Sequence, residues 1–165
     1  MMKKAHKLFE NITIVVDTRE QCPYRFGHDA VRAGLPTGDY SLLGFEDKVA
    51  IERKTVDDLV GCLKGAGRER FERELQRSRS MDYFALVIEG SLSGLAQGHY
   101  QSHMSPASVV QSILALSIRY RVPLWFAESR QMGQRITESL LEKYARDVCK
   151  RFAVLQGVIK KEEAA

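Results

Sequence analysis

Residues 38–58 read GDYSLLGFEDKVAIERKTVDD, and this stretch has the pattern of a β-hairpin. Two strand-like runs, YSLL and VAIERK, are joined by the turn sequence GFED. If Leu43 pairs with Lys48, counting back along both strands places Asp39 directly opposite Glu52. Two carboxylates in that position repel each other, and a divalent cation between them relieves the repulsion. The hairpin therefore predicts a site for Mg²⁺ or Mn²⁺, which prefer oxygen ligands.

Lys54 follows Glu52 by two residues, so the two side chains project from the same face of the strand. Two acids and a lysine are the groups that hydrolysis of a phosphodiester requires. The bound cation activates water, and the ammonium group stabilises the negative charge that develops on the phosphate. The alternative interpretation is that a surface hairpin carries these charges only for solubility.

The chain has 165 residues, of which 44% are hydrophobic and 28% are charged. This composition predicts one soluble globular domain with its own core. No apolar run is long enough to cross a bilayer, and the N-terminus lacks the features of a signal peptide. We therefore expect a cytoplasmic protein, or a nuclear one in a eukaryote, that is not secreted and has no membrane partner. Residues 1–11 form a basic N-terminal segment, residues 12–155 the folded domain, and residues 156–165 a charged tail.

The net charge of +4 and the isoelectric point near 9.0 are compatible with a nucleic-acid partner without requiring one. Basic residues crowd one segment after the hairpin: Lys64, Arg68, Arg70, Arg73, Arg77 and Arg79. Arginines beside acidic metal ligands suit a polyanionic substrate. The alternative is a solvated helix face, on which neighbouring glutamates partly neutralise the arginines. The three cysteines have neither zinc-ligand spacing nor the pattern of a disulfide framework.

The remaining pattern predicts alternating strands and helices. Apolar runs predict strands over residues 12–17 and 83–89, the hairpin strands over 35–43 and 48–54, and a last strand over 123–128. Helices are expected over residues 56–64, 68–80, 106–121 and 132–152, with loops over 18–26 and 90–105. Thr55 has the features of a helix N-cap with Asp58 as its capping partner, and Gly65-Ala66-Gly67 should break the helix. The order predicts a three-layer α/β domain with a central mixed sheet flanked by helices.

Several of these residues together resemble the nuclease domain of XPF-type structure-specific endonucleases. The resemblance is carried by VDTRE at residues 16–20, GD at 38–39, ERK at 52–54, then Asp58, Gly67-Arg68 and the run YFALVIEG. It covers residues 12–150. It implies a restriction-endonuclease-like fold and a metal-dependent DNA endonuclease, with Mg²⁺ or Mn²⁺ as cofactor. It also implies cleavage at branched DNA, such as flaps or forks, in repair or recombination.

The resemblance also implies roles for single residues. Asp39 and Glu52 would be metal ligands, with Asp17 adding a third acid, and Lys54 would position or activate water. Arg19 and Arg53 would hold phosphates or brace the carboxylates. Glu20 would be either a metal ligand or an ion-pair partner of Arg53. Asp58 closes the family signature, which is GD, a variable spacer, ERK, three residues and D, but an acid at this point also satisfies backbone N–H groups at a helix start.

The expected DNA contacts extend beyond the hairpin. Besides Arg19 and Arg53, they comprise Lys64, Arg68, Arg73 and Tyr100. Tyr100 belongs to the loop sequence GHYQSHM, where its ring would stack on DNA and the histidines would contact phosphate. An ordinary surface loop is the alternative.

The family resemblance and the last helix together predict a homodimer. An apolar stripe at every fourth position, Ile136, Leu140, Tyr144, Val148 and Phe152, would pack on the sheet. Leu141, Ala145 and the end of the stripe at Phe152 would then remain for a second copy to cover, unless the whole stripe is core within one chain. The tandem helix-hairpin-helix domain that usually follows the nuclease domain has no counterpart here. The chain is thus a stand-alone nuclease or an excised domain, which leaves room for a separate partner that recognises DNA structure.

Two other functional interpretations remain open. One is a non-catalytic DNA-binding or scaffold subunit of a nuclease complex, since the family contains inactive partners. Such partners lose acids of the signature, whereas this chain retains all of them. The other is a binding module for acidic ligands that uses only the basic helix.

Overall fold

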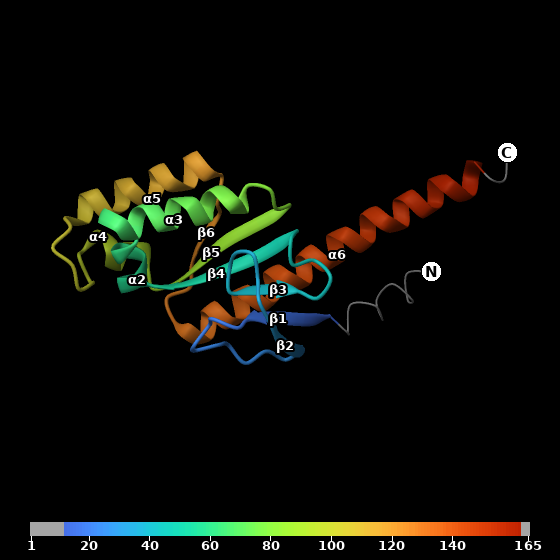
Figure 1. The fold of residues 1–165 in the computed structure, drawn as a ribbon, viewed down its shortest axis with the longest axis horizontal. Helices are drawn as coiled ribbons and strands as arrows, with labels where there is room; N and C mark the ends of the chain where they lie inside the picture. The colour runs from blue at the N-terminus through green and yellow to red at the C-terminus, as the bar shows by residue number, and fades with distance from the viewer. Residues whose placement is uncertain (1–11, 163–165) are drawn as a thin grey trace.

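A six-stranded mixed sheet forms the middle layer of the protein (Figure 1). The computed structural model describes residues 12–162. The strands are β1 (Thr13–Asp17), β2 (Asp29–Ala33), β3 (Tyr40–Leu42), β4 (Val49–Thr55), β5 (Tyr83–Glu89) and β6 (Leu124–Phe126). They lie in the order β2-β1-β3-β4-β5-β6, with β3 antiparallel to both of its neighbours and the other pairs parallel.

Helices cover both faces of this sheet. They are α2 (Val56–Gly61), α3 (Gly65–Ser78), α4 (Leu92–Ala96), α5 (Pro106–Tyr120) and α6 (Arg130–Glu162). The side chains of β4 alternate between two cores, because successive residues of a strand point to opposite faces. Ala50 packs with residues of α2, α3 and α5, whereas Val49 and Ile51 pack with residues of α6. The expected three-layer α/β arrangement is confirmed.

The hairpin of β3 and β4 has the register that the sequence predicts. Tyr40 pairs with Ile51, which is one step from the expected opposition of Asp39 and Glu52. Gly38 fixes the start of β3, because its φ of 79° lies in a region that favours glycine and a Cβ there would lie 2.8 Å from the Cβ of Ala50. The backbone N–H of Asp39 then donates to the carbonyl of Ile51 at 2.9 Å. The side chain of Asp39 is thereby fixed close to β4.

Several expected boundaries were wrong. Strand β2, an exposed edge strand of sequence DAVRA, lies within residues 27–34, for which no element was predicted, and the short helix α4 was expected to be loop. Residues 65–67 form the first turn of α3 instead of only breaking the helix, and α2 ends at Gly61. A Cβ on Gly67 would lie 2.6 Å from the carbonyl oxygen of Gly61, so this glycine lets α3 start in close contact with α2. Strand β2 was not recognised in the sequence because an exposed edge strand does not need the alternating apolar residues that indicate a half-buried strand.

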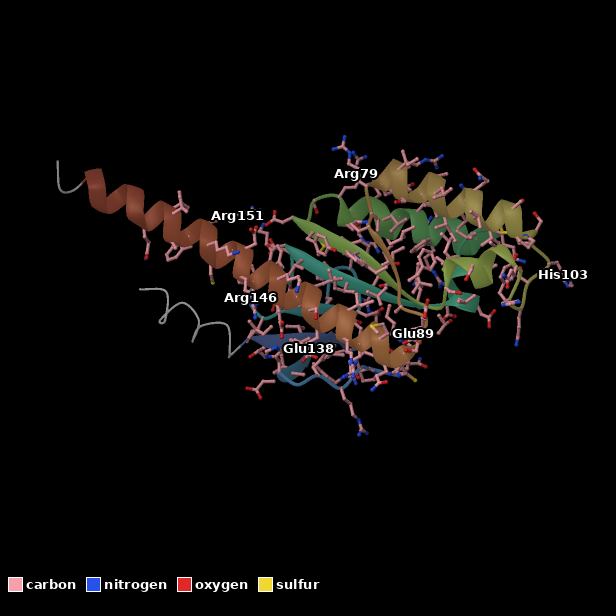
Figure 2. The ribbon with its side chains drawn as sticks, turned by 180° about the vertical axis from the view of Figure 1, so that it is seen from behind. Arg79, Glu89, His103, Glu138, Arg146 and Arg151 are labelled. Carbon is pink, nitrogen blue, oxygen red and sulfur yellow. The ribbon has the colours of Figure 1, made fainter. Side chains whose placement is uncertain are left out.

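Helix α6 crosses the face of the sheet opposite to α3 and continues well beyond it (Figure 2). Its buried line is Gly133, Thr137 and Leu141. The expected stripe is therefore displaced by one residue: Ile136, Leu140 and Tyr144 are only partly buried, and Phe152 is 58% exposed. Leu141 is fully covered within the chain, which removes it from the surface expected to pair with a second copy.

The two terminal segments expected from the sequence lie partly outside the described residues. The basic N-terminal segment, residues 1–11, lies outside the described residues, as do residues 163–165 of the expected tail. The helix runs ten residues past the expected end at Phe152, to Glu162. Between residues 12 and 162, no helix combines the length and apolar character that crossing a bilayer requires.

Candidate active site

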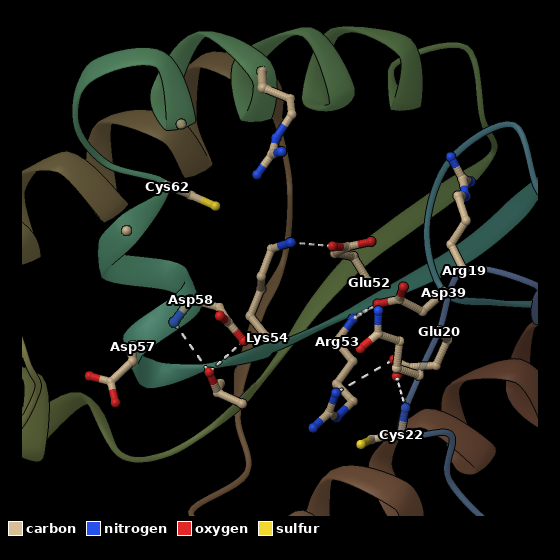
Figure 3. A pocket seen from close by; sticks show the side chains of 15 residues that line it. Arg19, Glu20, Cys22, Asp39, Glu52, Arg53, Lys54, Asp57, Asp58 and Cys62 are labelled. Carbon is tan, nitrogen blue, oxygen red and sulfur yellow. Dashed lines mark hydrogen bonds and ion pairs between the residues drawn. The ribbon is translucent and has the colours of Figure 1, made fainter.

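A cavity of about 690 Å³ opens beside the last residues of β4 (Figure 3). Four segments line it: the loop after β1, the hairpin, α2 and the start of α3. Its lining comprises Arg19, Glu20, Gln21, Cys22, Asp39, Glu52, Arg53, Lys54, Thr55, Asp57, Asp58, Gly61, Cys62, Gly67 and Arg70. Seven of the residues singled out in the sequence meet here: Arg19, Glu20, Asp39, Glu52, Arg53, Lys54 and Asp58.

Asp39 and Glu52 are the two carboxylates at the centre of the cavity. One oxygen of Asp39 accepts the backbone N–H of Arg53 at 2.8 Å, and Glu52 is only 6% exposed. Burial, helped by the negative charge of Glu20, outweighs the hydrogen bond from the Arg53 backbone and raises the pKa of Asp39 to about 6. Burial, together with the neighbouring charge of Asp39, also raises the pKa of Glu52 well above its usual value. The charge of the half-buried Asp39 thus opposes ionisation of the buried Glu52, and a divalent cation would stabilise such a pair of oxygen donors.

Lys54 forms an ion pair with Glu52 from the same face of β4. Its ammonium group also lies 5.3 Å from the centre of the Phe71 ring of α3. Burial by itself lowers the pKa of Lys54, but the carboxylate of Glu52 outweighs burial and raises the pKa above its usual value. The lysine is therefore protonated, and it lies where an anionic group entering the cavity would meet it.

Arg53 points to the opposite face of β4 and is held by two acids. Its guanidinium donates to both carboxylate oxygens of Glu89 at 2.9 and 3.2 Å and pairs with Glu20 at 3.5 Å. Burial lowers the pKa of Arg53, but the hydrogen bond with Glu89 and the negative charges of Glu89 and Glu20 outweigh it and raise the pKa above its usual value. Of the two roles that the sequence leaves open for Arg53, this geometry matches the bracing one. Glu20 correspondingly lies in an ion pair.

Glu89 connects this part of the cavity to the start of α6. Besides Arg53, it accepts the hydroxyl of Tyr24 at 2.9 Å and pairs with Arg130 at 3.3 Å. Arg130 also donates to the backbone carbonyl of Cys22 at 2.6 Å, and Cys22 lies on the loop that lines the cavity. The ends of β4, β5 and the loop after β1 are thereby tied to α6. Figure 2 places Glu89 beside the first turns of that helix.

Asp17 does not line the cavity. Its carboxylate accepts the Arg19 side chain at 2.7 and 3.0 Å and the backbone N–H groups of Arg19 and Leu35 at 2.8 and 2.7 Å. Although burial raises the pKa of Asp17, these donors outweigh it and hold the pKa below its usual value. The structure therefore does not bring together the three-acid cluster of Asp17, Asp39 and Glu52. Within residues 12–162, no group of three or more His, Cys, Asp or Glu is close enough to hold a metal ion.

Asp58 lines the cavity but acts at the start of α2. The Thr55 hydroxyl donates to its carboxylate at 2.6 Å and accepts its backbone N–H at 3.2 Å, which is the expected N-cap.

Three other residues expected to contact DNA lie outside the cavity. Lys64 donates to Ser102, Arg68 pairs with Glu72 at 2.7 Å, and Arg73 is exposed.

Tyr100 has partners within its own chain. Its hydroxyl donates to the carbonyl of Met104 at 2.7 Å, and its ring packs against the core under α5. These contacts match the alternative in which this loop is an ordinary surface loop. The neighbouring His103 lies at the far end of the molecule from α6 (Figure 2).

The sequence did not single out Arg70 or Asp57 as lining residues. Asp57 accepts the backbone N–H of Gln101 at 2.7 Å and so also anchors that loop. A signal for Arg70 was present, because Gly67, Arg70 and Phe71 lie at helical spacing on one face of α3. Phe71 belongs to the core together with Ala50 of β4, so the face of α3 that carries these three residues is directed toward β4.

We expect Asp39→Asn to raise the thermal stability of the metal-free protein more at about pH 8 than at about pH 5. Since the folded pKa of Asp39 is raised to about 6, the wild-type protein loses stability as the pH rises through about 6. Stability is complete below the unfolded-state pKa near 3.8, where both states carry the proton, and the cost of charging the half-buried Asp39 grows as the pH rises from there to about 6. Asparagine carries no charge, and its side-chain oxygen can still accept the Arg53 N–H. Melting temperatures measured across this range in chelator test the prediction, and a constant difference between the proteins would contradict it.

A model of the ERCC4 domain matches residues 16–140. A structure of XPF from Aeropyrum pernix has a TM-score of 0.64 at 22% identity and covers 80% of this chain and 61% of that chain. A structure of XPF from Aeropyrum pernix in complex with DNA has a TM-score of 0.65 at 22% identity and covers 83% of this chain and 66% of that chain. At this identity the structures establish a shared fold, and this chain spans less than two thirds of the length of either. The curated proteins contain no match.

Proposed function

Because this chain belongs to the ERCC4 domain family, we propose that it is a metal-dependent endonuclease that hydrolyses phosphodiester bonds in DNA. The observation that carries the proposal is the meeting of Asp39, Glu52 and Lys54 in one open cavity. Flap, fork or other branched DNA is the proposed substrate class, in repair or recombination. Retention of every acid of the signature favours this function over a non-catalytic scaffold subunit.

Asp39 and Glu52 would hold Mg²⁺ or Mn²⁺, which would supply a Lewis acid that activates water and polarises the phosphate. Glu52 is buried and Asp39 half-buried, and the pKa of each carboxyl is raised, so the two groups fit such an ion. Lys54 is already protonated and would donate hydrogen bonds to the attacked phosphate as its negative charge grows. Arg53 would support the site from the face of β4 opposite to Lys54. Its backbone N–H orients Asp39, while its side chain is fixed by Glu89 and Glu20.

We assign Asp17 a supporting role. Through its contacts with both the backbone and the side chain of Arg19, it orients an arginine that is 71% exposed at the cavity edge. Arg19 would then contact a DNA phosphate, and Asp58 would fix the start of α2. Outside the cavity, Lys64, Arg68 and Arg73 would contact the DNA backbone on one flank. Tyr100 would support this flank by holding the loop that Lys64 touches.

The direct test is cleavage of end-labelled oligonucleotides that form a flap, a fork and a plain duplex. We expect cleavage in Mg²⁺ or Mn²⁺, no cleavage in chelator, and preference for the branched substrates. The Glu52→Gln variant, purified in parallel, excludes a contaminating nuclease. Tight DNA binding without cleavage of any substrate by the wild-type protein would instead support the scaffold function.

We also propose that the protein is a homodimer that pairs through α6 and its neighbouring surface. The basis is the exposed apolar set on α6 beyond the sheet, where Phe152, Val154 and Leu155 are 58, 67 and 60% exposed. A second copy could bury this set, which would favour pairing through the hydrophobic effect. Light scattering at micromolar concentration should give a mass near twice 18.7 kDa. A mass of one chain would reject the dimer, and Phe152→Asp should shift the wild-type mass toward that value.

A further inference from the structure

The cavity contains four cationic side chains, and three of them have carboxylate partners. Arg19 pairs with Asp17 at 2.7 Å. Arg53 pairs with Glu89 at 2.9 Å, and Lys54 pairs with Glu52. A cation that already has a carboxylate partner must break or share that ion pair in order to bind a phosphate. These three are therefore incompletely available to a substrate.

Arg70 is the fourth cation and differs from the others. It is exposed, and across the described residues 12–162 the structure records neither a hydrogen bond nor an ion pair for its guanidinium. Its positive charge nevertheless acts inside the cavity, because it lowers the pKa of Cys62 against the larger effect of burial. Arg70 therefore contributes positive charge to the cavity that no acid among residues 12–162 neutralises by direct contact.

The position of Arg70 is fixed by its neighbours on α3. One turn earlier, Gly67 allows the helix to start against the carbonyl of Gly61. The next residue, Phe71, is 1% exposed and lies under the ammonium group of Lys54. Helix α3 thus lies across the cavity from the hairpin acids, as Figure 3 shows for the ribbon above Glu52 and Lys54. A strand entering the cavity would lie between the hairpin and this helix.

We propose that Arg70 binds the scissile phosphate of the bound DNA strand. This inference rests on the proposed nuclease function and adds a residue to its site. In the reaction, water attacks phosphorus, the bond to one ester oxygen breaks, and the departing oxygen receives a proton. The two non-bridging oxygens gain negative charge meanwhile, and a guanidinium can donate to both at once. Arg70 remains protonated throughout.

The neighbouring arginines fit this role less well. Arg68 is paired with Glu72 at 2.7 Å, and neither it nor Arg73 lines the cavity. Those two residues can contact phosphates only outside the cavity, where binding changes affinity but not the chemical step. Arg70 should therefore affect both the affinity and the rate at saturation, which separates it from a residue that only attracts DNA.

The test compares Arg70→Ala and Arg70→Gln with Arg135→Ala. Arg135 is an exposed arginine on α6, across the sheet from the cavity, so its loss matches the change in net charge. Single-turnover cleavage of a labelled flap is measured at saturating protein in Mg²⁺. Affinity is measured by fluorescence anisotropy in chelator over a range of salt concentrations.

Both Arg70 variants should lower the saturated cleavage rate by about 10²-fold, the scale of one lost transition-state donor. Their affinity should fall less steeply with salt, by about 0.9 in the logarithmic slope for one lost contact to duplex phosphate. Arg135→Ala should match the wild type in both measurements. Arg70 variants with a wild-type saturated rate would overturn the inference, whether or not affinity falls. A wild-type protein that cleaves no DNA would instead reject the proposed function itself.

Discussion

Replacement of Glu52 by glutamine should slow DNA cleavage in Mg²⁺ by about 10³-fold or more, the upper scale for losing one electrostatic contribution at a reaction centre. Glutamine keeps the shape of the side chain but removes the charge that would bind the cation. Glu52 is 6% exposed and pairs with Lys54, so its side chain is held in place at the wall of the cavity. Single-turnover cleavage of a labelled flap gives the rate.

A second measurement separates loss of the metal from loss of the fold. Calorimetric titration of the wild-type protein with Mn²⁺ should show binding that is lost in Glu52→Gln and in Asp39→Ala. Neither variant should unfold, because removal of one buried carboxylate relieves repulsion in the metal-free protein. Asp47→Asn is the matched control: Asp47 lies on the turn of the same hairpin, and its side chain is 70% exposed. Cleavage at the wild-type rate by Asp39→Ala or Glu52→Gln would mean that the metal site is assigned incorrectly.

Lys54→Ala should lower the cleavage rate at saturation by about 10²-fold while DNA affinity changes little. The ammonium group is held inside the cavity between Glu52 and the ring of Phe71, so we expect it to contact the attacked phosphate and not the flanking DNA. Only an interaction that strengthens in the transition state changes the rate without changing the affinity.

The matched control for Lys54 is Lys48→Ala, because Lys48 is a half-exposed lysine that pairs with Asp47 on the same hairpin. This control should leave both the rate and the affinity at wild-type values. Affinity is measured by anisotropy in chelator, and the rate in Mg²⁺ at saturating protein. If Lys54→Ala lost affinity and rate by the same factor, the lysine would be a ground-state phosphate contact instead of a participant in the chemical step.

The hairpin was predictable because its information is local. Strand periodicity of two and a four-residue turn fix the register, and the register alone places Asp39 beside Glu52. The N-cap at Thr55 is equally local, since donor and acceptor are three residues apart. Both features follow from backbone geometry, with no knowledge of the rest of the fold.

The buried face of α6 was not predictable from steps of four residues. Each step of four turns an α-helix by about 400°, so the stripe drifts by about 40° per step. Over the four steps from Ile136 to Phe152 the drift is about 160°, and the two ends cannot face the same sheet. The structure instead buries Thr137 and Leu141, whereas Tyr144 is half-buried and Phe152 is exposed.

The partners of Arg53 depend on distant parts of the chain. Glu89 lies 36 residues away, and Glu20 lies 33 residues away in the other direction. Both positions carry an acid in the sequence, but only the pairing of β4 with β5 and the path of the loop after β1 bring them to one guanidinium. The position of Arg70 also depends on the fold, because the order of charges along the sequence does not show which arginine of α3 lines the cavity.

The connection from Glu89 and Arg130 to the loop at Cys22 also bears on how the site is completed as the chain folds. During synthesis, the signature residues up to Asp58 leave the ribosome well before β5 and α6 exist. A nascent chain of that length can form the hairpin, but Arg53 still lacks Glu89, and the loop carrying Glu20 lacks its anchor at Arg130. Domains fold as units, so a catalytically competent geometry should appear late and cooperatively. A truncated fragment that ends before residue 83 would retain the entire signature and yet be inactive.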